Sequence, residues 1–120
     1  MLSPRKRGSA ARRSATLMNT EQMSQHAGEA ARLMKALANE KRLMILCNLA
    51  GGEMAVGQLL EVVPLSQSAL SQHLAVLRHD GLVRTRREAQ TIYYSLNGDR
   101  AERVIELLYD MYCSSAACAH

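Results

Sequence analysis

Apolar residues recur three and four positions apart along much of the chain, which is the spacing of amphipathic helices. The first segment of this kind begins at Glu21, with Thr20 as its N-terminal cap, and continues to Ala38. A second segment covers residues 40–50, and Asn39 before it has the side chain of a helix cap. The pattern therefore predicts two helices joined by a very short connection.

The second predicted helix carries a cysteine among its apolar residues. The members of its apolar face are Leu43, Leu46, Cys47 and Ala50. We therefore expect Cys47 to face the core. Gly51-Gly52 follows directly and ends the helix.

Two shorter helices follow, separated by a tight turn. The first covers residues 55–63 and is stopped by Pro64. The second covers residues 67–78, with Ser66 as its cap and Asp80-Gly81 at its end. Its buried stripe is expected to consist of Leu70, Leu74 and Leu77. A helix, a turn and a second helix in this order indicate a helix-turn-helix.

The pattern changes to β-rich residues between Leu82 and Leu96, which predicts a two-stranded hairpin. Asn97-Gly98 then turns the chain into a last helix over residues 99–115. Apolar side chains occupy more than one side of that helix, namely Val104, Ile105, Leu107, Leu108, Tyr109, Met111 and Tyr112. A terminal helix with so much apolar surface needs a partner. We expect it to form the interface of a homodimer.

These elements give the expected fold class, which is mainly α with a small β-hairpin, arranged as a homodimeric winged helix-turn-helix. At 120 residues the chain has the length of one compact domain. We assign residues 1–20 to a disordered basic N-terminal arm and residues 21–115 to the winged domain with dimerising terminal helices. Residues 116–120 are expected to form a flexible C-terminal tail.

The net charge of +4 comes from the N-terminal arm. Five basic residues and no acidic ones lie in the first 20 positions, whereas the rest of the chain carries ten basic and eleven acidic residues. One local basic stretch remains around the predicted hairpin. The start of the chain does not have the pattern of a secretion signal, and no apolar run approaches the roughly 20 residues of a membrane span. We therefore expect a cytoplasmic protein without a membrane partner, whose three cysteines are reduced at rest.

Polar side chains occupy the face of the second short helix that points away from its leucine stripe. The candidate DNA contacts on this helix are Gln67, Ser68, Ser71 and Gln72, with His73 in a secondary role. Gln matches an adenine edge in the major groove, and Ser hydroxyls can contact a base or a phosphate. The hairpin adds Arg84, Arg86 and Arg87 as contacts to the DNA backbone or minor groove. Each feature alone is also typical of a solvated surface, but their order favours binding to double-stranded operator DNA.

Two stretches of the chain carry a family resemblance. They read LANEKRLMILCNLAGGEMAVGQLL and LSQSALSQHLAVLRHDGLVRTRREAQTIYYSL, and they resemble the ArsR family, also called ArsR/SmtB, of bacterial winged-helix repressors. The resemblance covers about residues 24–113 and implies a homodimeric repressor that leaves its operator when an inducer binds. One departure is the hairpin tip Glu88-Ala89-Gln90-Thr91, where many relatives have a Gly. A tight turn that needs a positive φ is less comfortable there.

Metal-sensing members of this family use ligands that are mostly missing here. Residues 54–63 contain no Cys, His or Asp, and the acidic residues of the last helix are not accompanied by His. A tetrahedral metal site needs about four suitable ligands. Only Cys113, Cys118 and His120 cluster in the sequence, so we predict no metal or other cofactor and keep a metal-responsive repressor using these three residues as an alternative.

The positions of Cys47 and Cys113 resemble those of the dithiol members of the family, the persulfide- and redox-sensing BigR, SqrR and HlyU type. This resemblance implies that a disulfide or polysulfide bridge joins the two residues in response to reactive sulfur species or oxidants, and that DNA affinity then falls. A further alternative is a dimeric protein-interaction module without DNA binding. An enzyme is not expected, because no constellation of His, Cys and acid lies on a predicted cleft.

Overall fold

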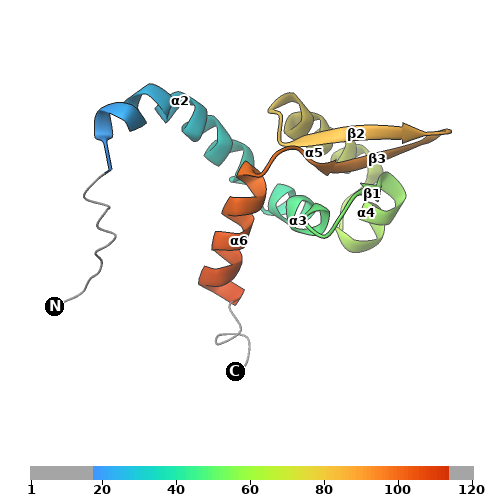
Figure 1. The fold of residues 1–120 in the computed structure, drawn as a ribbon. Helices are drawn as coiled ribbons and strands as arrows, with labels where there is room; N and C mark the ends of the chain where they lie inside the picture. The colour runs from blue at the N-terminus through green and yellow to red at the C-terminus, as the bar shows by residue number, and fades with distance from the viewer. Residues whose placement is uncertain (1–17, 114–120) are drawn as a thin grey trace. The chain divides into compact units, whose positions relative to one another are not determined.

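The structure is a computed structural model, and it describes residues 18–113. Within that range the elements are α2 (Thr20–Leu37), α3 (Glu40–Leu49), β1 (Met54–Ala55), α4 (Val56–Val62), α5 (Gln67–His79), β2 (Val83–Glu88), β3 (Thr91–Leu96) and α6 (Arg100–Cys113) (Figure 1). Backbone contacts divide the chain into residues 1–31 and residues 32–120. Most of the predicted arm, the predicted tail and the end of the predicted last helix lie outside the described residues.

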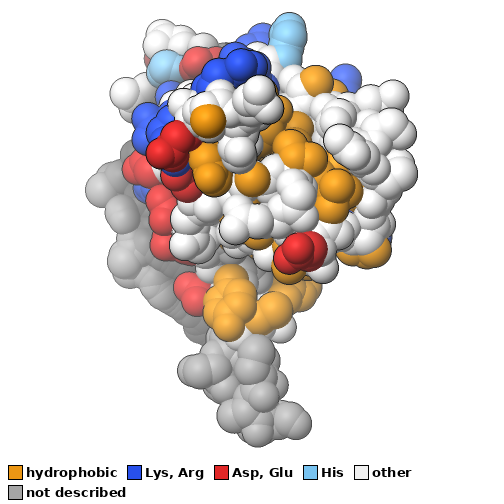
Figure 2. All heavy atoms as spheres, turned by 90° about the vertical axis from the view of Figure 1, so that its right-hand side faces the viewer, with side chains coloured by type: hydrophobic (Ala, Val, Ile, Leu, Met, Phe, Trp, Pro, Cys, Tyr) orange, Lys and Arg blue, Asp and Glu red, His pale blue; other side chains and the backbone are white. Residues whose placement is uncertain are grey.

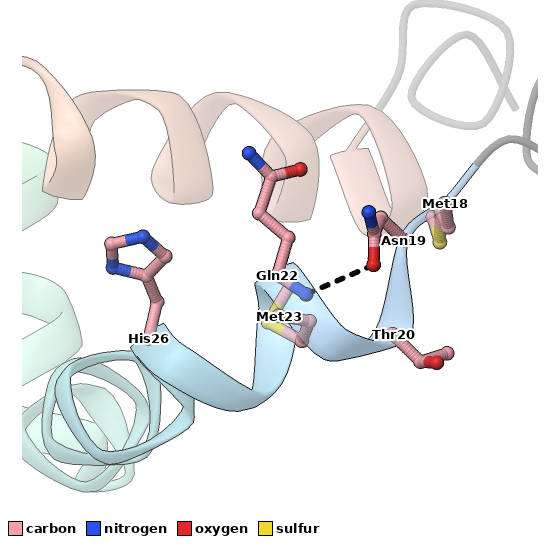
Figure 3. Close-up of a pocket in the computed structure, with 6 residues that line it drawn as sticks. All are labelled: Met18, Asn19, Thr20, Gln22, Met23 and His26. Atoms are coloured by element: carbon pink, nitrogen blue, oxygen red, sulfur yellow. Dashed lines mark hydrogen bonds between the residues drawn. The ribbon is translucent and has the colours of Figure 1, made fainter.

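The first unit contributes the beginning of α2. The side chain of Asn19 accepts hydrogen bonds from the backbone N–H groups of Glu21 and Gln22, each at 3.0 Å. Figure 3 shows the second of these hydrogen bonds. The prediction that Thr20 caps this helix is therefore wrong, because Thr20 already lies inside it. Asn is among the strongest N-cap residues, so the helix begins one position earlier than its apolar pattern suggested.

Helix α3 begins where the sequence predicts, but the face that it buries differs from the predicted one. The side chain of Asn39 accepts from the backbone N–H of Arg42 at 3.0 Å, which confirms the predicted cap. The buried residues of α3 are Ile45, Leu46 and Leu49, whereas Cys47 is exposed. The prediction that Cys47 faces the core is therefore wrong. Residues 45, 46 and 49 define the buried face, and position 47 lies to one side of it.

The sheet has three antiparallel strands in the order β1-β3-β2. The predicted hairpin is confirmed by the continuous pairing of β2 with β3, from Val83 opposite Leu96 to Glu88 opposite Thr91. The additional strand β1 pairs Met54 with Tyr94 and corrects the prediction of only two strands. A strand of two residues is too short to show an alternating pattern, and the expected helix over residues 55–63 begins instead at Val56.

The turn between β2 and β3 adopts a positive φ, although the sequence of the hairpin tip makes such a turn less comfortable. Ala89 has a φ of 58°, in the left-handed region that L-residues with a Cβ rarely occupy. The described part of the chain has no other non-glycine residue with a positive φ. The hairpin therefore closes with a tight turn although it lacks a glycine.

The core lies where α3, α4 and α5 meet the base of the sheet. Leu70, Leu74 and Leu77 of α5 are fully buried, which confirms the predicted stripe. They pack with Ile45 and Leu46 of α3 and with buried residues of α4, β2 and α6. This core fixes the orientation of α5 and leaves its opposite face open. None of the helices between residues 18 and 113 is long and apolar enough to cross a membrane.

Candidate DNA interface and cysteine pair

Helices α4 and α5 pack on each other and form the predicted helix-turn-helix. The hydroxyl of Ser66 accepts from the backbone N–H of Ala69 at 3.1 Å, which confirms Ser66 as the cap of α5. Since the leucine stripe is buried, the polar residues near the start of α5 point outwards. Gln67, Ser68, Ser71 and Gln72 are all exposed, and His73 is half-buried. The structure thus brings the four leading candidates of this helix together on its open face.

The hairpin β2–β3 projects beyond the helices as a two-stranded wing (Figure 1). The structure places Arg84, Arg86 and Arg87 on β2, and all three are exposed. Figure 2 looks onto the end of the molecule where this hairpin terminates, and it shows basic side chains with acidic side chains next to them. The wing is therefore not a purely positive surface, and its arginines have to be considered one by one.

Arg86 is held by two carboxylates. Its Nη2 and Nε donate to the two carboxylate oxygens of Glu53 at 2.6 and 3.2 Å, and its Nη1 donates to Glu88 at 3.0 Å. The guanidinium also lies 4.7 Å from the centre of the Tyr93 ring. The hydrogen bonds from Arg86 lower the pKa of the Glu53 carboxyl, and the hydrogen bond to Glu53 is the largest cause that raises the pKa of Arg86.

Sequence reasoning missed Glu53. This residue lies 33 positions before Arg86. The two residues meet because β1 pairs with β3, and β3 pairs with β2, which carries Arg86. Because β1 is only two residues long, the pattern gave no sign of that pairing. Glu53 and Arg86 have complementary charges, but charge alone does not identify a partner at such a distance in sequence.

Cys47 and Cys113 lie on two helices that pack against each other, α3 and α6 (Figure 1). Both residues are thiols in the structure; Cys47 is exposed and Cys113 is half-buried. Desolvation is the larger cause that raises the pKa of the Cys47 thiol, and the negative charge of Cys113 raises it further. Such an electrostatic effect requires proximity. The fold therefore places two cysteines that are far apart in the sequence on helices that pack against each other.

The last helix presents the apolar surface that the sequence predicts. Ala101 and Ile105 of α6 are buried in the core. By contrast, Leu107, Tyr109, Met111 and Tyr112 are each more than half exposed. These four side chains lie on more than one side of α6, and the described part of the chain leaves them uncovered.

The alternative metal site would use Cys113, Cys118 and His120 as ligands. Cys118 and His120 lie outside the described part of the chain, and only Cys113 of the three is placed. Among residues 18–113, no group of three or more His, Cys, Asp or Glu side chains is arranged to hold a metal ion.

A helix-turn-helix with an open polar face, followed by a projecting β-hairpin, defines the winged helix-turn-helix class. Residues 39–85 match the family model described as "Bacterial regulatory protein, arsR family". Transcriptional activator HlyU of Vibrio cholerae is 52% identical over 98 residues, which span 82% of this chain and 91% of HlyU. The chain belongs to the ArsR family of bacterial DNA-binding transcriptional regulators, which are not enzymes.

Further relatives support the same assignment. The Biofilm growth-associated repressor of Agrobacterium fabrum is 49% identical over 92 residues, which span 77% of this chain and 79% of the relative. The crystal structure of the transcriptional repressor BigR from Xylella fastidiosa matches with a TM-score of 0.76 and 41% identity, covering 80% of this chain and 98% of BigR. The predicted resemblance to HlyU and BigR is thereby confirmed.

Proposed function

We propose that this ArsR-family regulator is a homodimeric repressor whose operator affinity is lost when a disulfide or polysulfide bridge joins Cys47 and Cys113. The signal is a reactive sulfur species or another oxidant. The observation that carries the proposal is the packing of α3, which carries Cys47, against α6, which carries Cys113, because a bridge can form only between neighbouring thiols. Of the three similar proteins named above, two are repressors and one is an activator. We assign repression to this chain on the basis of the two repressors.

The bridge can form by ordinary thiol exchange. Cys47 is the more exposed of the two residues, so we assign the first attack to its thiolate. Attack on the outer sulfur of a persulfide RSSH gives a Cys47 persulfide and releases RS⁻. The Cys113 thiolate then attacks the inner sulfur, which forms the disulfide and releases HS⁻. The two thiols are oxidised, and the incoming persulfide is reduced to a thiol and sulfide.

A polysulfide bridge follows from a second equivalent of the same reagent. When both cysteines carry a persulfide, displacement of one outer sulfur leaves a bridge of three sulfur atoms and releases H₂S. Such a bridge is longer than a disulfide and demands less movement of α3 towards α6. Either product fixes the position of α3 against α6.

Operator binding is assigned to α5 and the wing. The exposed Gln67 and Gln72 suit base contacts in the major groove, and Ser68 and Ser71 suit bases or phosphates. His73 is half-buried and has at most a secondary contact. Two copies of α5 in a dimer would read half-sites about 34 Å apart.

Release is assigned to a change in the spacing of the two recognition helices. Helix α3 packs against α5 as well as against α6. The exposed apolar side chains of α6 form the surface on which a second copy would pack. A bridge between α3 and α6 therefore acts on both the reading helix and the dimer contact.

The test is DNA binding by the reduced full chain before and after treatment with inorganic polysulfide. Wild type is expected to bind its operator when reduced and to release it after treatment. Cys47→Ser and Cys113→Ser are expected to bind normally and to stay bound. Cys118→Ser is the matched control and is expected to respond like wild type. Normal release from the Cys47→Ser or Cys113→Ser variant would remove that cysteine from the mechanism.

Mass spectrometry gives the chemical readout of the same reaction. A disulfide lowers the mass of the chain by two hydrogen atoms, and each additional sulfur adds one sulfur mass. The expected crosslinked peptide joins the segments that contain Cys47 and Cys113. A crosslink between Cys113 and Cys118 in its place would contradict the proposed pair.

A further inference from the structure

Arg86 stands apart from the other two arginines of the wing. Arg86 forms ion pairs with Glu53 and Glu88. Among residues 18–113, neither Arg84 nor Arg87 forms an ion pair. We propose that Glu53 is a positioning residue for DNA recognition, because it holds Arg86 and thereby fixes the wing relative to the rest of the domain. Arg86 then acts as a brace and not as a phosphate contact. This inference rests on the proposed use of the wing in DNA binding.

The brace connects the wing to the segment that follows α3. Glu53 directly precedes β1, and Ala55 of β1 is paired with Tyr93 of β3. Tyr93 in turn is paired with Arg86 of β2. Glu53, Tyr93 and Arg86 therefore meet on one face of the sheet, because residues paired across neighbouring strands point to the same side and Glu53 is two residues from Ala55.

The backbone alone attaches this edge of the sheet weakly. The strand β1 pairs through only two residues, whereas β2 and β3 pair through six. The two hydrogen bonds from Arg86 to Glu53 add a forked contact of the kind that fixes direction as well as distance. The Tyr93 ring lies against the guanidinium and limits its movement further.

The charges around Arg86 argue against a direct phosphate contact. All three guanidinium nitrogens already donate to carboxylates. One cation faces two anions, so an approaching phosphate would meet a site with net negative charge. Arg84 and Arg87 are exposed on the same strand without such partners in the described range, and they are the wing arginines left to neutralise phosphates.

Salt dependence separates a brace from a phosphate contact. Each phosphate that a protein neutralises on duplex DNA contributes about 0.9 to the slope of log affinity against log salt. A residue that only positions the wing changes the affinity but leaves this slope unchanged. A residue that binds a phosphate changes both.

The experiment measures operator binding of the reduced full chain over a range of salt concentrations. The test variants are Arg86→Gln and Glu53→Gln. Arg86→Gln removes the fork together with the positive charge, so a phosphate contact at this position would flatten the slope. Glu53→Gln keeps the size but loses the negative charge. The matched controls are Arg87→Gln on the same strand and Glu61→Gln, an exposed acid on α4.

We expect Arg86→Gln to weaken operator binding by roughly three- to tenfold at an unchanged slope, although it removes a positive charge. Glu53→Gln is expected to do the same, and the double variant is expected to be no weaker than either single variant. Arg87→Gln is expected to flatten the slope by about 0.9. Glu61→Gln reports the general effect of losing one negative charge and is expected to bind at least as well as wild type.

Order in the wing gives a second readout. In ¹⁵N relaxation, the amides of β2 and β3 are expected to become more mobile in Arg86→Gln and Glu53→Gln, and to stay unchanged in Arg87→Gln. Tighter binding by Glu53→Gln than by Glu61→Gln would overturn the proposal, because it would mean that Glu53 competes with DNA for Arg86. Arg86→Gln with wild-type affinity, or with a slope flattened by about 0.9, would overturn it as well.

The result is independent of the thiol switch. The four single variants and the double variant all keep Cys47 and Cys113, so polysulfide should release each of them as it releases wild type. An Arg86→Gln or Glu53→Gln protein that binds weakly at an unchanged slope and is still released supports the brace and leaves the switch intact. If wild type is not released, the switch fails while the comparison of reduced proteins still decides the role of Glu53.

Discussion

The environment of a single thiol sets how readily the proposed sensor reacts. Desolvation and the charge of Cys113 both raise the pKa of Cys47. The thiolate is the reactive form, so a raised pKa keeps most of Cys47 in the unreactive thiol form near neutral pH. Reactivity should therefore increase as the pH rises, with its midpoint above the ordinary value for cysteine.

This effect of Cys113 can be measured directly. We expect alkylation of Cys47 by iodoacetamide to accelerate with pH, and we expect Cys113→Ser to lower the midpoint because it removes a negative neighbour. The measurement is the pH dependence of the Cys47 adduct by mass spectrometry. Tyr112→Phe serves as the control and should leave the midpoint where it is in wild type. An identical midpoint in Cys113→Ser would show that the two thiols do not interact.

The wing tip offers a separate test of backbone strain. Ala89 has a φ of 58°, where a residue with a Cβ is strained and glycine is not. We expect Ala89→Gly to stabilise the protein by about 0.5–1 kcal/mol, because relief of the strain outweighs the greater freedom of glycine in the unfolded chain. Urea unfolding checks this. Gln90→Gly, at a neighbouring position without positive φ, should give no such gain.

The burial and the contacts of individual side chains were harder to predict from the sequence than the helices and strands. The sequence placed the polar positions of α5 correctly, because its three leucines define the buried side without ambiguity. It misplaced Cys47, because the apolar residues of α3 surround the helix and only packing decides which of them are buried. The contact between Glu53 and Arg86 depends on strand pairing that local patterns do not contain.

At the level of elements, caps and turn residues made most boundaries predictable. Asn39 and Ser66 begin α3 and α5 as expected, and Gly81 with a positive φ follows the end of α5. The exception is β1, whose two residues are paired only because β3 lies beside them. Whether these two residues form a strand depends on the neighbouring strand β3 and not on a pattern in their own sequence.

The exposed polar face of α5 can be tested for a role in recognising the base sequence of the operator. We expect Gln72→Ala to reduce discrimination at one base pair of the operator by about 1–3 kcal/mol, with little change in the salt dependence. The measurement compares affinity for the operator and for single-base variants. Gln25→Ala, an exposed glutamine on α2, is the control. Equal loss of affinity on every DNA sequence would assign Gln72 to a phosphate contact instead.

At the scale of the whole molecule, α3 connects the parts that the proposed switch needs. It packs against α6, which carries Cys113, against the reading helix α5, and against β3 of the wing. Cys47 lies on its exposed side, and Glu53 follows only four residues after its end. A displacement of α3 by a bridge would therefore reach both DNA-binding elements. The packed core allows little independent movement between them.

The exposed apolar side of α6 provides the test of the proposed dimer. Leu107 is 57% exposed and lines a groove with Leu33 of α2 and Val104 of α6. We expect Leu107→Glu to give monomers, because a carboxylate cannot be buried in an apolar interface without a partner. Analytical ultracentrifugation measures this change.

Loss of the dimer should also change operator binding. A monomer engages one half-site, so we expect the affinity of Leu107→Glu for the full operator to fall by roughly 100-fold, since linked sites reinforce each other. Glu106→Gln, at the adjacent exposed position, should remain dimeric and bind normally. If Leu107→Glu stays dimeric, the interface lies elsewhere on the molecule. If it is monomeric and still binds the full operator like wild type, the paired reading of two half-sites is wrong.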